Sequence, residues 1–435
     1  MESFQPLRHG RGGVGGIIQT AAIALRRALN AIRIYASSLF LFLFLLAATV
    51  SVGAGKPAGP MANQLAPSFP DDSSYDSLNK AITINLAYLS GQPPGKTVQI
   101  DGKTVPLARL AKSLRLLQDI LARNPSPEEL DGLMKEHFDI IQAAGTRGSN
   151  PGQDLLVTGY YQPIIAGSLT REAPFLFPLY GVPDDLVQRN PRKDGPAFGR
   201  LENDLLVPYW TREEIEKQQR AAGHELVWLQ DPFDAYLVHV QGSAIIQFRD
   251  GSRRGIHFAA KNGHPYQSIG SYLIRTGRLS RRTSTMQTIR DYIAAHPSER
   301  DEIFHSNPSF IFFAWTDTTA VIGSLGTVLT AGRSLAADHN FFPSGALGFL
   351  VSRRPKVADD NTVHWAPLHR FVVVQDSGSA IKGRGRVDLF WGTGPEAGAE
   401  AGLMKEAGAL YFFLAKEEAP QASPDQAGTA RGNGS

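Results

Sequence analysis

The chain has 435 residues and contains no cysteine. This absence excludes disulfides, thiolate metal ligands and a cysteine nucleophile. It also excludes a lipid attached to a cysteine behind an export signal, so we expect a protein that is not a lipoprotein.

Metal and nucleotide motifs are also missing. The eleven histidines form no His-Glu-x-x-His pattern, so we predict no metal and no other cofactor. Gly392-Thr-Gly394 lacks the strand–helix unit of a dinucleotide loop, and Gly242-Ser243 lacks the Gly-x-Ser-x-Gly elbow of serine hydrolases. These observations disfavour nucleotide-dependent, metal-dependent and serine-hydrolase chemistry.

Net positive charge is confined to the N-terminal segment. The whole chain carries a net charge of +3, but five arginines and one glutamate within residues 1–54 contribute +4. The remainder therefore sums to about −1, and we predict no nucleic-acid partner.

The first 54 residues have the features of a targeting segment. An apolar run from Leu39 to Val50 follows basic residues and is closed by the small residues Val52-Gly-Ala54, which favours a cleaved export signal. An apolar stretch extended over Tyr35–Val52 leaves an uncleaved anchor open as the alternative. We therefore expect an exported, periplasmic protein, and membrane association stays open. The basic residues are Arg8, Arg11, Arg26, Arg27 and Arg33.

The 43 glycines and 28 prolines favour many turns and a β-rich architecture. A helix is predicted over Leu107–Arg123, a second from Ser126 to about Ile141, and a short one after the capping box Thr211-Arg-Glu-Glu214. Strands are predicted at Leu237–Phe248, Gly255–Ala260, Phe310–Trp315, Gly348–Val351, Phe371–Val374, Val387–Trp391 and Leu410–Leu414.

Two acids near the C-terminus are the strongest candidates for chemistry. Asp376 follows an apolar run, and Asp388 lies in a strand-like alternation between Val387 and Leu389. Loss of hydration raises the pKa of such an acid and lets it donate a proton near neutral pH, as glycosidic cleavage requires. The alternative is that both acids are ordinary solvated turn residues.

The segment around these acids resembles the C-terminal signature of the membrane-bound lytic murein transglycosylase A family, which belongs to the three-aspartate domain group. It reads Asp376-Ser-Gly-Ser-Ala-Ile-Lys-Gly383, then Asp388-Leu-Phe-Trp391, then Gly392-Thr-Gly-Pro-Glu-Ala-Gly398. Ser379 departs from the glycine that is usual in the family. Further motifs follow in the family's order at Val157–Pro163, Val240–Ser243, Ala260–His264, Ser268–Gly270, Ser284–Ile289 and Asn307–Phe310.

The resemblance implies a mainly β fold with flanking helices (α+β). A double-psi β-barrel domain would be interrupted by a second β-rich domain, with a groove between them. The expected organisation is a signal peptide or anchor at 1–54, a linker at 55–72, a helical prelude and first barrel part at 73–158, the insert at 159–309, the barrel with the three-aspartate motif at 310–415, and a disordered tail at 416–435.

For function, the resemblance implies a lytic transglycosylase. Such an enzyme cleaves the β-1,4 bond between N-acetylmuramic acid and N-acetylglucosamine in peptidoglycan and forms 1,6-anhydro-N-acetylmuramic acid. The family's catalytic aspartate maps onto Asp388, Asp376 is the second catalytic candidate with a positioning or charge-stabilising role, and Asp338 resembles the first acid of the group. A loop-holding role is the preferred interpretation for Asp338.

The expected partner is a peptidoglycan glycan strand. The candidate substrate-binding residues are Tyr160, Tyr161, Gln162, Gln241, Ser243, Lys261 and Lys382, and His264 could join Lys261 at stem-peptide carboxylates. We expect a monomer, with complexes with cell-wall machinery left open. Two alternatives remain: a glycoside hydrolase that uses water on the same barrel, with Asp388 as acid and Asp376 as base, and a non-catalytic glycan-binding module.

Overall fold

A computed structural model of the chain describes residues 68–144, 155–188, 198–282, 284–358, 360 and 362–417. All of these residues fall within one compact unit. The predicted export signal at 1–54, residues 55–67 of the predicted linker and residues 418–435 of the predicted tail lie outside the described residues. No helix within the described ranges has both the length and the apolar character needed to cross a membrane.

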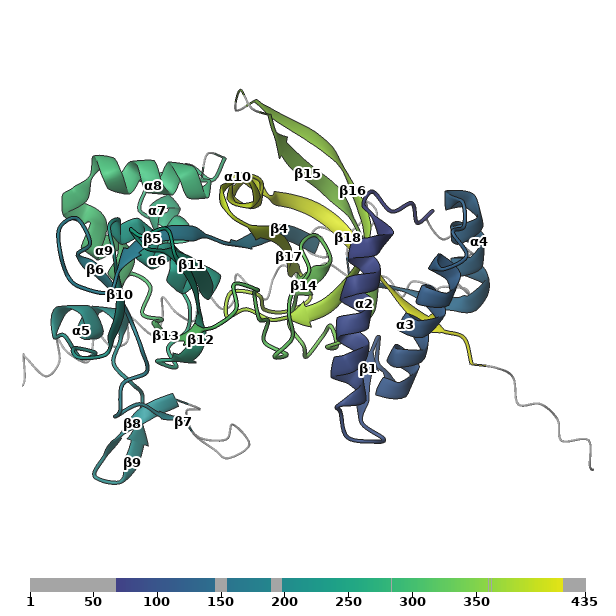
Figure 1. The fold of residues 1–435 in the computed structure, drawn as a ribbon, viewed down its shortest axis with the longest axis horizontal. Helices are drawn as coiled ribbons and strands as arrows, with labels where there is room; N and C mark the ends of the chain where they lie inside the picture. Colours follow the sequence, from purple (N-terminus) through teal and green to yellow (C-terminus); the bar gives the residue numbers. More distant parts are fainter. Residues whose placement is uncertain are drawn as a thin grey trace, which may run out of the picture. The chain divides into compact units, whose positions relative to one another are not determined.

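A closed β-barrel of six strands forms the centre of the fold (Figure 1). The strands follow the order β15, β16, β14, β17, β4 and β18, and β18 pairs back onto β15 to close the barrel. Two neighbouring pairs, β14–β16 and β17–β4, are parallel, whereas the others are antiparallel. The strands are β4 (Leu155–Gln162), β14 (Ser334–Ala336), β15 (Leu347–Val357), β16 (Val363–Asp376), β17 (Arg386–Thr393) and β18 (Lys405–Ala415), with β3 (Phe138–Ala144) added to β18. The predicted mainly β fold with flanking helices is confirmed.

The barrel interior is filled by aromatic and branched side chains from alternating strand positions. The Phe69 ring enters this core, with its centre 5.1 Å from that of Phe349 and 5.0 Å from that of Phe413. Close by, Asp71 forms a fully buried two-pronged ion pair with Arg333 at 2.6 and 2.9 Å. The side chains of Phe69 and Asp71 therefore anchor this segment in the barrel, which differs from the linker predicted to extend to Asp72.

Three helices precede the barrel strands. They are α2 (Tyr75–Ser90), α3 (Leu107–Leu121) and α4 (Pro127–His137), with the hairpin β1 (Thr97–Ile100) and β2 (Lys103–Pro106) between the first two. The predicted start of α4 is confirmed by a capping box in which Ser126 and Glu129 bond each other's backbone N–H groups. Its predicted end near Ile141 is wrong, because Phe138 is extended and begins β3, which pairs with β18.

A second sheet of six strands lies between β4 and β14 in the chain, in the order β13, β12, β11, β5, β10 and β6. A small sheet of β7, β8 and β9 accompanies it. The strands are β5 (Ile164–Ser168), β6 (Phe177–Tyr180), β7 (Val187–Gln188), β8 (Phe198–Glu202), β9 (Leu205–Val207), β10 (Glu225–Leu229), β11 (Ser243–Gln247), β12 (Arg253–Lys261) and β13 (Ile311–Thr316). The helices are α5 (Arg212–Lys217), α6 (Pro232–Gln241), α7 (Ile269–Arg275), α8 (Met286–Ala295), the short 3₁₀ helix η1 (Pro297–Glu299) and α9 (Arg300–His305).

Two features of this second sheet differ from the prediction. The segment Leu237–Phe248 is not one strand, because α6 is capped by Asp231, continues to Gln241 and ends at Gly242, whose φ is +79°. Only β11 is extended there. Strand β13 pairs with β12 rather than with a barrel strand, so the barrel resumes later in the chain than the predicted position 310.

Candidate active site

The site begins with the parallel pairing of β17 and β4. Asp388 lies opposite Thr158 on β4 and opposite Ala336 on β14, near the middle of β17. Val387 and Leu389 are buried in the barrel core, and Asp388 alternates with them, so its side chain points to the other face of the strand. Phe390 shares that face, and its ring centre is 5.3 Å from that of Tyr160.

The Asp388 carboxyl is poorly solvated and poorly paired. Its side chain is 14 % exposed, and its Oδ1 atom is buried without a hydrogen-bond partner among the described residues. The nearest cation is Arg386, whose Nη2 is 3.6 Å from Oδ2. Burial raises the pKa of Asp388 to about 6, the nearby Asp376 charge also raises it, and Arg386 acts against both effects. Near neutral pH this group can therefore exchange a proton with a ligand.

Asp376, in contrast, is surrounded by donors. Its Oδ1 accepts the backbone N–H groups of Ser324 and Ser377, each at 2.8 Å, and its Oδ2 accepts the Tyr160 hydroxyl at 2.8 Å. Burial raises the pKa of Tyr160 well above its usual value, and the Asp376 charge adds to this effect. Tyr160 therefore stays protonated and acts as a fixed donor to Asp376.

Asp338 holds a loop. Its Oδ1 accepts the backbone N–H and the side-chain amide of Asn340 at 3.1 and 2.9 Å, and its Oδ2 accepts the Gly383 N–H at 2.9 Å. Burial alone would raise the pKa of Asp338, but these hydrogen bonds and the Lys382 charge outweigh burial and lower it. These contacts agree with the preferred loop-holding interpretation.

The predicted sugar-contacting residues on β4 divide between the two faces of the strand. Tyr160 faces Asp376, whereas Tyr161 packs against Gly398 of α10 (Pro395–Leu403). This helix was not predicted from the sequence. Gln241 is fixed by accepting the Tyr161 N–H at 3.1 Å. Gln162 is 2 % exposed and accepts the Thr393 hydroxyl at 3.1 Å, so its side chain is not available to a ligand.

The remaining predicted binding residues lie beyond β4. Ser243 is 6 % exposed at the start of β11, which does not support its predicted contact with substrate. Lys261 is half-buried with its Nζ 5.7 Å from the Phe198 ring centre, and Lys382 is exposed. Burial lowers the pKa of Lys261, and the Lys382 charge lowers it further, so the two cations influence one another. Among the described residues, no group of histidines and acids could hold a metal ion.

Three neighbours of the acids were not predicted from the sequence. Arg386 precedes Asp388 by two residues and so shares its strand face, a relation that the alternation could have revealed. Its Nε donates to the Thr158 hydroxyl at 3.2 Å. Ser324, on the loop after β13, and Tyr266, whose pKa is raised by burial and by the Asp388 charge, carry no local sequence signal.

Two family models match the chain. Residues 156–314 match the "MltA specific insert domain", and residues 333–414 match the "3D domain". The membrane-bound lytic murein transglycosylase A of Escherichia coli K12 is 32 % identical over 275 residues, which cover 63 % of this chain and 69 % of that protein. The protein of the same name from Vibrio cholerae is 31 % identical, covering 65 % of this chain and 72 % of its own.

The chain belongs to the membrane-bound lytic murein transglycosylase A family.

Solved structures of the family have the same fold. A membrane-bound lytic murein transglycosylase from Agrobacterium tumefaciens superposes with a TM-score of 0.64 at 31 % identity, covering 79 % of this chain and 93 % of that one. The Escherichia coli MltA with bound chitohexaose gives a TM-score of 0.60 at 25 % identity, covering 81 % and 94 %. The resemblance to the membrane-bound lytic murein transglycosylase A family is thus confirmed.

Proposed function

We propose that this chain cleaves the β-1,4 bond between N-acetylmuramic acid and N-acetylglucosamine in peptidoglycan and leaves a 1,6-anhydro-N-acetylmuramic acid end. Membership of the family makes the chain a peptidoglycan-cleaving lytic transglycosylase. The single observation that carries the mechanism is the Asp388 carboxyl, which is buried, has an oxygen without a partner in the described part of the chain, and has a pKa of about 6.

The reaction needs one acid that works twice. Protonated Asp388 gives its proton to the glycosidic oxygen, and the bond from that oxygen to the muramoyl anomeric carbon breaks. The 6-hydroxyl of the same muramoyl residue then forms the new bond to the anomeric carbon, and its proton goes to the Asp388 carboxylate. Asp388 ends in the protonated state in which it began, and no water is consumed. Because the nucleophile belongs to the substrate, its effective concentration is high.

Asp376 is the second acid of this mechanism. Its charge stabilises the positive charge that develops at the anomeric carbon, and the Tyr160 hydroxyl and two backbone N–H groups keep it in place. These three donors occupy most of the acceptor positions of the carboxylate, which leaves little room for it to hold and orient an attacking water. That arrangement favours the transglycosylase over the glycoside hydrolase in which Asp376 would be the base.

Glycan contacts outside the two acids are assigned by position. Lys382 follows Asp376 on the loop between the two acids, and Lys261 lies within its electrostatic reach, so this pair can meet the carboxylates of stem peptides. Tyr161 packs against Gly398 of α10, and Gln241 accepts its backbone N–H, so we assign both to contacts with the glycan strand away from the reacting sugar. We assign the activity to a monomer that is exported to the periplasm and acts on peptidoglycan glycan strands.

Mass spectrometry of digested murein sacculi tests this function. The parent chain and Asp250→Asn, which changes an exposed turn acid bonded to Ser252, should both release anhydro-muropeptides. Asp388→Asn should release at least about a thousandfold less. Products with hydrated reducing ends would indicate a hydrolase, and retention on sacculi without any release by the parent would indicate a glycan-binding module.

A further inference from the structure

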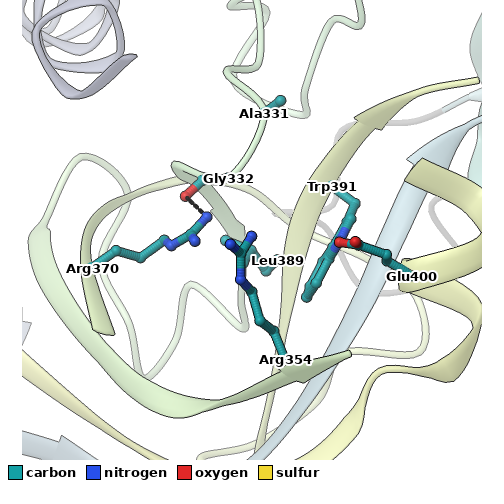
Figure 2. A pocket seen from close by; sticks show the side chains of 7 residues that line it. All are labelled: Ala331, Gly332, Arg354, Arg370, Leu389, Trp391 and Glu400. Atoms are coloured by element: carbon teal, nitrogen blue, oxygen red, sulfur yellow. Dashed lines mark hydrogen bonds between the residues drawn. The ribbon is translucent and has the colours of Figure 1, made fainter. Parts of the chain in front are cut away.

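A cavity of about 170 Å³ lies beside β17 on the face opposite to Asp388. Leu389 and Trp391 line it, and both alternate with Asp388 along the strand. The remaining walls come from the turn before β14, from β15 and β16, and from α10. Figure 2 shows Trp391 and Glu400 on one side of the cavity and Arg354 and Arg370 on the other. The lining is completed by Ala331 and Gly332.

The two arginines differ in how they are paired. Asp72 accepts two hydrogen bonds from Arg370, from Nε at 2.8 Å and from Nη2 at 3.0 Å. The Nε of Arg354 is 3.9 Å from the same carboxylate, is buried, and has no hydrogen-bond partner among the residues that the structure describes. Its side chain is only 24 % exposed. A buried donor without a partner costs free energy and shows that Arg354 is incompletely paired by the protein. The guanidinium group of Arg354 lies at the cavity in Figure 2, where a ligand with an acceptor can bind it.

An acid faces this cation across the cavity. The Glu400 Oε2 accepts the Trp391 indole N–H at 2.7 Å, which fixes the carboxylate beside the ring. No ion pair joins Glu400 to Arg354 in the described part of the chain. The cavity therefore presents one positive and one negative group that are held apart, over a floor formed by Leu389.

The balance of charge selects a class of ligand. Asp71 neutralises Arg333, and Asp72 is shared between the close Arg370 and the more distant Arg354. The three arginines therefore exceed these two acids by one positive charge, and the remaining acid at the cavity is Glu400. A simple anion would be attracted by Arg354 but repelled by Glu400. A simple cation would be attracted by Glu400 but repelled by Arg354. A small dipolar ion satisfies both groups at once, and an aliphatic side chain fits the apolar floor.

We propose that this cavity binds a small zwitterionic amino acid, with its carboxylate on Arg354 and its ammonium group on Glu400. This site does not depend on Asp388 or on the proposed reaction, because its lining belongs to the other face of β17.

The experiment is a titration of the full-length chain labelled with 5-fluorotryptophan, followed by ¹⁹F NMR. The chain has five tryptophans, and Trp391→Phe identifies the Trp391 signal. Glycine, L-alanine and D-alanine are the probes, with propionate and ethylamine as shape-matched ligands that keep only the carboxylate or only the amine. We expect a saturable shift of the Trp391 signal with alanine at millimolar concentrations and at least tenfold weaker binding of propionate and ethylamine.

Variants then connect the shift to the cavity. Arg354→Gln and Glu400→Gln should each weaken alanine binding at least tenfold. Arg353→Gln is the matched control, because Arg353 is the adjacent residue on β15, is 63 % exposed and pairs with Glu406 instead. Its binding should equal that of the parent. Unchanged signals from Trp210, Trp228 and Trp315 show that each variant is folded, whereas the Trp365 signal should move in Arg353→Gln because Arg353 lies over that ring.

Several results would overturn the proposal. Propionate binding as tightly as alanine would make the cavity a plain anion site. An alanine shift that survives Arg354→Gln would place the binding elsewhere. No shift of the Trp391 signal at about 100 mM alanine would show that the cavity binds no amino acid and is filled only by water.

Discussion

Asp388→Asn should make the protein more stable at neutral pH while it abolishes activity. The reason is the cost of ionising a buried carboxyl. Burial raises the pKa of Asp388 from 3.8 to about 6, so the folded protein holds this proton over a pH range in which the unfolded chain has released it. Asparagine has nearly the same shape and carries no charge, so the variant avoids this cost.

The sign and size follow from proton linkage. Below pH 3.8 both states of the parent are protonated, and Asp388 contributes no penalty. As the pH rises through about 6, stability is lost progressively, to a total of about 3 kcal/mol for a shift of this size. The loss is only about 0.5 kcal/mol at pH 4 and is nearly complete at pH 7.5. The advantage of Asp388→Asn should therefore grow with pH over this window.

Thermal unfolding followed by circular dichroism is the assay. With an unfolding entropy of roughly 0.7 kcal/mol/K for the region 68–417, about 3 kcal/mol corresponds to a rise in Tm of about 4 °C. We expect that rise for Asp388→Asn at pH 7.5 and a rise below about 1 °C at pH 4.

Asp338→Asn is the matched control with the opposite sign. The hydrogen bonds of Asp338 lower its pKa, so its charge stabilises the folded state, and that stability is present at neutral pH and is lost as the pH falls through its folded pKa. This variant should have a lower Tm than the parent at pH 7.5. An Asp388→Asn variant that is equally or less stable than the parent at pH 7.5, or whose Tm difference does not change with pH, would refute the desolvation of Asp388.

Three further predictions concern the pair of acids and the core. The pKa of Asp388 predicts an alkaline decline of kcat/KM near pH 6 in the parent, and Arg386 lowers that pKa. Arg386→Gln should therefore move the decline upward by up to about one pH unit, and an unchanged pH profile would exclude this coupling. Tyr160→Phe removes one of the three donors to Asp376 but keeps the ring beside Phe390. The kcat on sacculi should therefore fall about ten- to a hundredfold with little change in sacculus binding. A variant with the kcat of the parent would show that the Tyr160 hydroxyl has no role in the reaction. Phe69→Ala should destabilise the barrel by about 3–5 kcal/mol in urea unfolding, because its ring is fully buried between Phe349 and Phe413; a loss below about 1 kcal/mol would mean that residues 68–72 are dispensable to the core.

The sequence alone was sufficient for features that depend on local chemistry. The alternation around Asp388 predicted its strand. The cap, proline and acids of Ser126-Pro-Glu-Glu129 predicted where α4 begins, and the capping box at Thr211 predicted where α5 begins. These features could be predicted because a helix cap or an alternating strand depends on residues within a few positions of one another. Apolar runs were less informative, since Leu237–Gln241 suits a buried strand as well as the helix that it forms.

The tertiary structure decided everything that requires distant segments to meet. Tyr160 on β4 reaches Asp376 at the end of β16 only because β17 and β14 join these two strands in one sheet. The Ser324 N–H reaches the same carboxylate from a loop 52 residues earlier. The raised pKa of Asp388 depends on what covers it once the barrel closes, which no local pattern encodes. Closure of the barrel brings these groups together because strand pairing depends on register and burial across the whole sheet, and neither is a property of any single segment.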